Sequence, residues 1–335
     1  MHFAIRRKVS GDTTVAKTTK SDDAGLSVYD GAIKNSVAPS ATLALEHAKT
    51  WLDGLDRRPV GPETDLVSLR DLLGGTIPDQ GTLPERVIDE LVALSESGHM
   101  GSASGRFFAW VIGGSLTSAL AADWLVSTWD QNAAIYACGP SVSVIEETAG
   151  AWILDLLDLP REASFAFTTG CQFAHVTSLA TARHSLLMRQ GWNVEEEGLF
   201  AAPRITVLTT AQHHESIEHA VRFLGVGRKS IELIPMNENG QATAAGLSAA
   251  LEDTDGPTIV ILNAADLNLG ACDDFSELIP IAHDANAWVH IDGAFGLFAR
   301  ASRCKRHLVD GVDLADSWAT DAHKWLSVAC PFMRR

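Results

Sequence analysis

The chain has 335 residues, of which 46% are hydrophobic, 20% charged and 7% aromatic, and its mean hydropathy is +0.06. This composition is typical of a soluble globular protein and argues against a disordered, collagen-like or membrane-spanning chain. Acidic residues outnumber basic ones by 42 to 26, which gives a formal net charge of −16 at pH 7. A surface this negative disfavours nucleic acid and anionic membranes as partners, so a small-molecule enzyme is the better hypothesis.

The five cysteines are scattered along the chain and include no CxxC pair: Cys138, Cys171, Cys272, Cys304 and Cys330. This pattern predicts reduced thiols in a cytoplasmic protein, and neither a disulfide framework nor a zinc cluster.

The N-terminal third predicts a polar tail followed by helices. Residues 1–39 show little periodicity and are expected to be loosely ordered. An apolar stripe at helical spacing predicts a helix over residues 40–55, which the prolines at 59 and 62 end, and a second helix is predicted over 84–96. Residues 97–105 are rich in Gly and Ser and break the pattern, so residues 40–105 form an N-terminal helical segment.

From residue 106 onward, short apolar runs alternate with helical stretches. Helices are predicted over 116–129 and from Pro140 to about 159, and then near 173–190, 216–224, 243–251 and 275–285. Strands are predicted over 164–168, 205–209, 231–235, 258–263, 288–292 and 316–320. Strands that alternate with helices favour parallel pairing through right-handed crossovers, so the predicted fold class is α/β with a doubly wound sheet.

Several of the predicted strands are followed by polar residues, and ligands of such sheets bind at the carboxyl ends of the strands. Gly170 permits a tight turn before a helix whose first N–H groups favour an anion such as phosphate, although any strand–Gly–helix junction looks similar. His213 and His214 follow the next strand, where a histidine could be a metal ligand, a general base, a ring-stacking partner or a surface residue. Taken alone, the pair is best interpreted as surface residues.

Two further strand ends carry an acid and a lysine. Asp292 closes an apolar strand, where a carboxylate is costly unless a cation lies against it. Lys324 follows the last strand and is either a solvated surface lysine or a desolvated amine suited to forming an imine. Together the phosphate turn, a histidine, the acid and the lysine are the groups that pyridoxal phosphate requires.

Five segments in this order carry a family resemblance. They are Arg106-Phe107-Phe108-Ala109-Trp110 with Gly113-Gly114, Thr169-Gly170-Cys171-Gln172, Gln212-His213-His214-Glu215-Ser216, His290-Ile291-Asp292-Gly293-Ala294 and Asp321-Ala322-His323-Lys324-Trp325. Over residues 40–326 the chain resembles the group II pyridoxal-phosphate-dependent amino-acid decarboxylases, the aromatic-amino-acid and glutamate decarboxylase group. The resemblance implies the aspartate-aminotransferase-like fold, fold type I, with residues 106–335 as the cofactor-binding large domain.

The resemblance also implies roles for individual residues. Lys324 would form the Schiff base, Asp292 would pair with the pyridine nitrogen, and His214 would stack on the ring. The remaining cofactor-binding residues implied are Gly170, Cys171, Gln172, Ala294, Asp321 and His323, and the implied substrate pocket contains Phe108, Trp110 and Asn268. A homodimer in which residues 40–105 help to form the interface is expected, with an L-amino acid as substrate.

The sequence departs from the family at two places. Family members continue after the lysine with a further strand, a loop that commonly supplies a tyrosine, and a C-terminal small domain, whereas this chain has eleven residues after Lys324. We therefore expect a large domain that is incomplete at its C-terminus, with the small domain missing, and doubtful turnover. Many relatives also carry Gly and a hydroxyl residue where this chain has Cys171 and Gln172, which leaves a side-chain contact to phosphate in question.

The leading hypothesis is decarboxylation of an L-amino acid to an amine and carbon dioxide, and the amino acid is left open. An aminotransferase or aldehyde-forming enzyme of the same fold type is the enzymatic alternative. A non-catalytic remnant that binds the cofactor is the second. Metal-dependent hydrolysis through His213, His214, His290 and Asp292 is the third, but it leaves Lys324 and the phosphate turn unexplained, so no metal is predicted.

Overall fold

The computed structural model describes residues 24–328. The chain divides into two compact units, residues 1–107 and 108–335, and each is described by itself. This division lies two residues after the predicted start of the large domain.

From residue 24 onward, the first unit contains three helices and a 3₁₀ turn: α1 (Ala24–Gly54), α2 (Leu66–Leu73), α3 (Pro84–Ser95) and η1 (Glu96–Gly98). The prediction of a loosely ordered tail through residue 39 was wrong for residues 24–39, because α1 begins at Ala24 and Pro39 lies inside the helix. The tail lacks an apolar stripe, and periodicity cannot identify a helix without one. Residues 1–23 of the predicted tail lie outside the described residues.

Aromatic and charged side chains hold the end of α1 against the loops of the same unit. The guanidinium of Arg58 lies 4.1 Å above the ring of Trp51 and pairs with Glu96 at 2.7 Å. Trp51 also contacts His99 edge to face, with ring centroids 5.5 Å apart. Arg106 donates to the carbonyls of Leu55 and Arg58, so the end of this unit is fixed to the end of α1.

The second unit is an α/β unit with a five-stranded parallel sheet. Its order is β2-β1-β3-β4-β5, and all four neighbouring pairs are parallel. The strands are β1 (Thr206–Thr209), β2 (Ile231–Leu233), β3 (Thr258–Asn263), β4 (Trp288–Asp292) and β5 (Ser317–Ala319). These are five of the six predicted strands, and the parallel α/β prediction is confirmed.

The helices of this unit also follow the predicted pattern. They are α4 (Thr117–Trp129), α5 (Pro140–Leu156), α6 (Cys171–Arg189), α7 (Val194–Glu197), α8 (Glu215–Phe223), α9 (Ala244–Glu252), α10 (Phe275–Asp284) and α11 (Ala322–Trp325). Three 3₁₀ turns lie between β4 and β5: η3 (Gly296–Ala301), η4 (Arg306–Val309) and η5 (Val312–Leu314).

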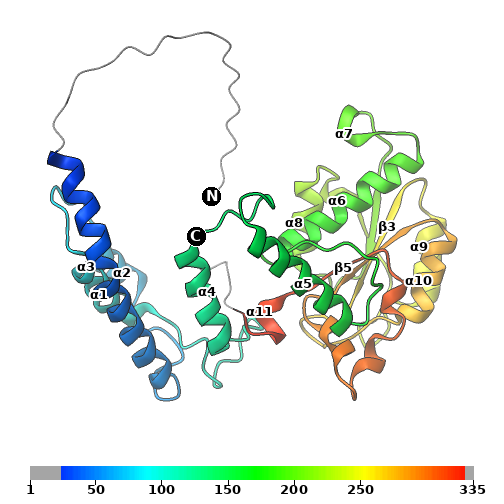
Figure 1. The fold of residues 1–335 in the computed structure, drawn as a ribbon. Helices are drawn as coiled ribbons and strands as arrows, with labels where there is room; N and C mark the ends of the chain where they lie inside the picture. Colours follow the sequence, from blue (N-terminus) through cyan, green and yellow to red (C-terminus); the bar gives the residue numbers. More distant parts are fainter. Residues whose placement is uncertain (1–23, 329–335) are drawn as a thin grey trace, which may run out of the picture. The chain divides into compact units, whose positions relative to one another are not determined.

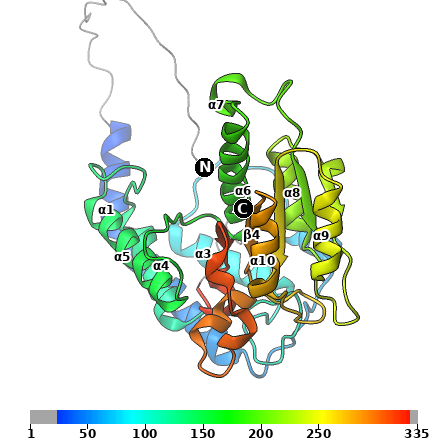
Figure 2. The same cartoon turned by 90° about the vertical axis from the view of Figure 1, so that its right-hand side faces the viewer.

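The two faces of the sheet bury different helices, because successive residues of a strand point to opposite sides. On β3, Ile259 and Ile261 belong to a core with α6 and α8, whereas Val260 and Leu262 belong to a core with α9 and α10. Figure 1 shows these two helix pairs on opposite sides of the sheet, and Figure 2 shows α10 beside β4. Register pairs His290 with Ile261 and Asp292 with Asn263, so both polar side chains of β4 lie on the face that α6 covers.

The predicted strand over 164–168 is wrong, because this segment has no regular secondary structure. Alternating aromatic residues, Phe165 and Phe167, gave the segment its strand-like sequence, and both are exposed. A strand requires hydrogen bonds to a neighbour, which sequence alternation does not supply. β5 is at the edge of the sheet and pairs only with β4 among the described strands.

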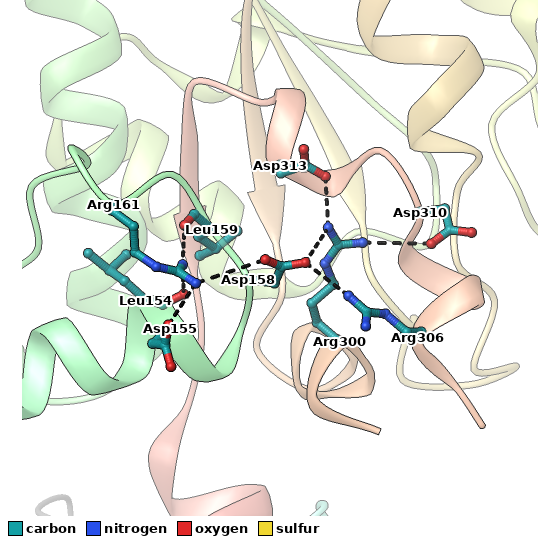
Figure 3. Close-up of polar contacts among 9 residues, drawn as sticks. All are labelled: Leu154, Asp155, Asp158, Leu159, Arg161, Arg300, Arg306, Asp310 and Asp313. Atoms are coloured by element: carbon teal, nitrogen blue, oxygen red, sulfur yellow. Dashed lines mark hydrogen bonds and ion pairs between the residues drawn. The ribbon is translucent and has the colours of Figure 1, made fainter. Parts of the chain in front are cut away.

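An ion-pair cluster connects the end of α5 to the turns between β4 and β5 (Figure 3). The Asp158 carboxylate, just after α5, lies 2.9 Å from Arg306 and 3.2 Å from Arg300. Arg300 also pairs with Asp313 at 3.1 Å and with Asp310 at 3.6 Å, and its side chain is only 11% exposed. Since Arg300 joins three carboxylates, it is the centre of this cluster.

Candidate active site

The predicted phosphate turn is formed as expected. Gly170 precedes α6 with φ +98°, a left-handed conformation that glycine adopts without strain. The first hydrogen bonds of the helix are donated by Phe173 and Ala174 to the Gly170 carbonyl, at 3.1 and 3.2 Å. The amides of Cys171 and Gln172 precede these bonds at the positive end of the helix dipole, so this turn fits an anionic phosphate. The Gln172 side chain instead donates to the Ser216 carbonyl at 3.1 Å, which ties the turn to α8.

Asp292 is held at the carboxyl end of β4 with only 8% of its surface exposed. Its Oδ1 accepts a hydrogen bond from the amide of Ala294 at 3.1 Å. The amide of Gly293 donates to the Ala319 carbonyl at 2.9 Å, and the Thr320 hydroxyl donates to the Gly293 carbonyl at 3.0 Å. These bonds continue the β4–β5 ladder past Asp292, so the carboxylate is fixed on a rigid element.

Lys324 lies in α11, five residues after β5 ends at Ala319. Its Nζ is 3.9 Å from Oδ2 of Asp321, whose Oδ1 lies 2.8 Å from Nδ1 of His323. The segment at Gly113 packs directly on this helix: a Cβ built on Gly113 would lie 2.1 Å from the Lys324 carbonyl oxygen. The Ser327 hydroxyl donates to the Gly113 carbonyl at 3.1 Å, so residues distant in sequence fix the lysine segment.

His214 is the N-cap of α8 and is exposed. Its Nδ1 accepts a hydrogen bond from the amide of Ser216 at 3.2 Å and lies 2.8 Å from the hydroxyl of the same residue. Capping fixes the ring and leaves Nε2 as the protonated nitrogen. His213 is turned away, with Nδ1 2.7 Å from the Thr210 carbonyl and Nε2 3.5 Å from Glu218.

The charges of these groups act on two buried side chains, Cys171 and His175. Burial raises the pKa of the Cys171 thiol well above its ordinary value, the charges of Asp292 and Asp321 raise it further, and Lys324 opposes them. Burial also lowers the pKa of His175, which the same three charged groups and His214 influence. Residues from the ends of two strands therefore act on the same two buried side chains of α6, and their joint role in cofactor binding stays a prediction.

His175 is a site residue that the sequence analysis missed. It is fully buried on α6, with Nε2 3.6 Å from Asp292 Oδ1 and 3.5 Å from the Cys171 sulfur, and with Nδ1 3.0 Å from Nε2 of His290. Its spacing of four residues from Cys171 places both on one helix face, which was the available signal. The face that this helix turns toward β4 could be identified only from the fold.

The structure does not gather the four residues of the metal-hydrolysis alternative. Among residues with described side chains, one group of three potential ligands has its atoms within 4.8 Å of one another: Cys171, His175 and Asp292. Of the proposed four, only Asp292 belongs to this group. His290 is hydrogen-bonded to His175 and lies 2.9 Å from the Ser317 hydroxyl.

The described contacts do not join the three predicted substrate-pocket residues to the cofactor residues. Phe108 is 93% exposed and Trp110 is 70% exposed. Asn268 donates to the side-chain oxygen of Gln212 at 2.9 Å, which places its loop beside the segment that precedes His214. A substrate contact for these residues therefore stays a prediction.

A helix start with amides ahead of its first hydrogen bonds, a carboxylate at the end of β4 and a lysine beyond β5 are the groups that a pyridoxal-phosphate site on a parallel α/β sheet requires. The donor set fits each part of that cofactor: free amides for its phosphate, an acid for its ring nitrogen and an amine for its aldehyde.

Comparison with known proteins agrees with this class. The family described as pyridoxal-dependent decarboxylase conserved domain matches residues 68–333. The chain therefore belongs to the pyridoxal-dependent decarboxylase family, and its cofactor is pyridoxal phosphate. Two similar proteins are the aromatic-L-amino-acid decarboxylases of Bacillus atrophaeus and Rattus norvegicus. Both are 28% identical to this chain. The match with the Bacillus atrophaeus protein covers 84% of this chain and 58% of that protein, and the match with the Rattus norvegicus protein covers 85% and 61%.

Solved structures agree on the fold. Mouse CSAD in its apo form has a TM-score of 0.80 at 22% identity and covers 90% of this chain and 63% of its own. Oryza sativa TDC with PLP and tryptamine has a TM-score of 0.79 at 24% identity, and the match covers 88% of this chain and 62% of the TDC chain. These matches place the second unit in fold type I, as predicted. The chain spans about three fifths of the length of these relatives.

Proposed function

We propose that the protein removes the α-carboxylate of an L-amino acid as carbon dioxide and releases the corresponding amine. The observation that carries this proposal is the grouping of Cys171, the first residue of α6, with His175 and Asp292 within 4.8 Å of one another. Lys324 lies 3.9 Å from Asp321 beyond the neighbouring strand. Family membership supplies the reaction class. The names of the relatives favour aromatic amino acids as the first substrates to test.

Each residue has a role that follows from its position. The amides of Cys171 and Gln172 would bind the phosphate, and Asp292 would hold a proton on the pyridine nitrogen. Lys324 would hold the aldehyde carbon through its amine until a substrate amine replaces it. His214, fixed as a helix cap, would cover one ring face. When bound, pyridoxal phosphate accepts the electron pair released as a bond at the substrate α-carbon breaks.

The same residues would serve an aldehyde-forming enzyme or an aminotransferase, because the orientation of the substrate decides which bond breaks. A structurally similar protein is the Rhodiola rosea 4-hydroxyphenylacetaldehyde synthase, at a TM-score of 0.75 and 24% identity. Product analysis separates the three reactions, since they give an amine, an aldehyde and a keto acid. Cofactor binding without any product would support the non-catalytic alternative.

The first experiment is a visible absorbance spectrum of the purified chain with pyridoxal phosphate, beside Lys324→Ala and a matched control, Lys305→Ala. We expect a protonated-imine band in the wild type and in the control, and its absence in Lys324→Ala. Amino acids are then screened for release of carbon dioxide and amine. A soluble chain without a Lys324-dependent band would refute the proposal.

We also propose a homodimer in the cytoplasm. Large apolar side chains of α4 and α5 are exposed in the single chain, and a second copy would cover them: Trp124, Leu125, Trp129, Ile145 and Trp152. No described helix combines the length and apolarity needed to cross a bilayer, and the four cysteines of the described residues are free thiols. Light scattering during size-exclusion chromatography measures the oligomeric state, and a monomer at micromolar concentration would contradict the dimer.

A further inference from the structure

A continuous chain of polar contacts leads from β5 to Oδ1 of Asp292. The Trp288 indole donates to the Ser317 hydroxyl oxygen at 2.9 Å, and this hydroxyl lies 2.9 Å from Nδ1 of His290. Nε2 of His290 is 3.0 Å from Nδ1 of His175, whose Nε2 is 3.6 Å from Asp292 Oδ1. His175 and His290 are both fully buried.

The strand register creates this alignment. His290 pairs with Ser317 across β4 and β5, so their side chains leave the sheet on the same side. Asp292 lies two residues further along β4 on the same face, and α6 packs over it with His175. The contacts therefore depend on two strands and one helix, all of them rigid elements.

The contacts of the Ser317 hydroxyl favour one arrangement of the hydrogens. An indole N–H can only donate, so the Ser317 oxygen accepts from Trp288, and Nδ1 of His290 is the acceptor that the described contacts offer to the hydrogen of this hydroxyl. Burial lowers the pKa of both His175 and His290, so each ring is neutral at pH 7 and carries one hydrogen. His290 then carries its hydrogen on Nε2 and donates it to Nδ1 of His175. As a result, His175 carries its hydrogen on Nε2.

We propose that Ser317, His290 and His175 form an oriented hydrogen-bond chain that presents the Nε2–H group of His175 to Asp292 and so positions the carboxylate that faces the cofactor ring. The three are positioning residues. Their expected effect on cofactor binding rests on the proposed function. The Ala294 amide and His175 both approach Oδ1 of Asp292. Oδ2 is consequently the oxygen left for the pyridine nitrogen.

Cys171 offers the opposite arrangement. Its sulfur is 3.5 Å from Nε2 of His175, so a thiol hydrogen directed at that nitrogen would require His175 to carry its own hydrogen on Nδ1. His290 would then donate to the Ser317 oxygen, and the Ser317 hydrogen would lose its described acceptor. Nε2 of His175 and the Asp292 carboxylate, both without a hydrogen, would also face each other. The oriented chain avoids both penalties, because every hydrogen in it has an acceptor.

The test reads histidine tautomers in the full chain before any cofactor is added. Nitrogen-15 histidine labelling gives the protonation of each ring nitrogen, and the spectra of His175→Gln and His290→Gln assign the two rings. We expect both rings to be neutral at pH 7 with the hydrogen on Nε2. An unprotonated Nε2 on His175 would overturn the inference.

A second measurement uses a mild variant. Ser317→Ala removes the hydroxyl that orients His290, so we expect a mixed tautomer population and an affinity for pyridoxal phosphate about tenfold weaker. Ser302→Ala is the matched control, since its hydroxyl contacts Cys304 instead. Unchanged tautomers and affinity in Ser317→Ala would overturn the inference. The tautomer spectra are recorded without cofactor and therefore do not depend on the proposed function. A missing Lys324-dependent band refutes the proposed function, whereas a hydrogen on Nδ1 of His175 refutes only this inference.

Discussion

Replacing Gly113 by alanine tests how the lysine segment is held. The added Cβ would lie 2.1 Å from the Lys324 carbonyl oxygen, 2.6 Å from that of His323 and 2.9 Å from the Lys324 carbonyl carbon. All three atoms belong to the backbone, so no side chain can rotate away. Ordinary contact requires the two segments to separate by about 1 Å. Overpacking of this kind costs about 1–3 kcal/mol, which lowers the melting temperature of a unit of this size by about 2–12 °C.

The functional effect is expected to exceed the effect on stability. A shift of about 1 Å in a reacting group reduces turnover by about 100-fold. The assays are thermal unfolding and the visible spectrum with pyridoxal phosphate. Gly105→Ala is the matched control, because a Cβ there meets no atom within 4 Å. A Gly113→Ala variant with the melting temperature and cofactor band of the control would refute the packing of this segment on Lys324.

Two further expectations concern stability. Burial lowers the pKa of His175 and His290, so the unfolded chain binds more protons in acid. Their contribution is complete above the unfolded pKa of about 6.5 and is lost as the pH falls, at up to about 1.4 kcal/mol per pH unit for each ring. The free energy of unfolding, measured with urea between about pH 5 and 7, should therefore change less steeply with pH in His290→Gln than in the wild type. An equal pH dependence in the two proteins would contradict a lowered pKa for His290. Arg300→Leu removes the largely buried guanidinium shared by three partly exposed carboxylates, and we expect the free energy of unfolding to fall by about 1–2 kcal/mol. Arg306→Leu, 50% exposed, should cost less than about 1 kcal/mol, and equal losses would show that Arg300 is not the centre of the cluster.

The order and type of most elements followed from the sequence because their signals are local. The strand at 258–263 has a continuous apolar centre, and the strand at 288–292 is rich in aromatic and β-branched residues; the structure reproduces both ranges. Pro84 and Pro140 mark helix starts, since proline lacks the N–H that the first turn leaves unused. The strand predicted over 164–168 was wrong for the converse reason, because a strand needs a neighbouring strand and the local sequence does not specify one.

The same division applies to the site. Asp292 and Lys324 could be proposed from the sequence because each closes or follows an apolar strand, and topology brings the carboxyl ends of parallel strands together. Gly170 could be proposed because a glycine directly precedes a helical stretch. His175 and Ser317 carried no comparable signal, because a histidine on a helix and a serine on a strand occur in many settings.

Their roles depend on which side chains face one another. Register sets His290 beside Ser317, and the packing of α6 on that face of the sheet sets His175 against both His290 and Asp292. The sequence by itself determined the fold class and the reactive groups, since these follow from apolar patterning and residue chemistry along the chain. Only the tertiary structure decided how those groups are oriented, because hydrogen-bond direction depends on contacts between residues more than one hundred positions apart.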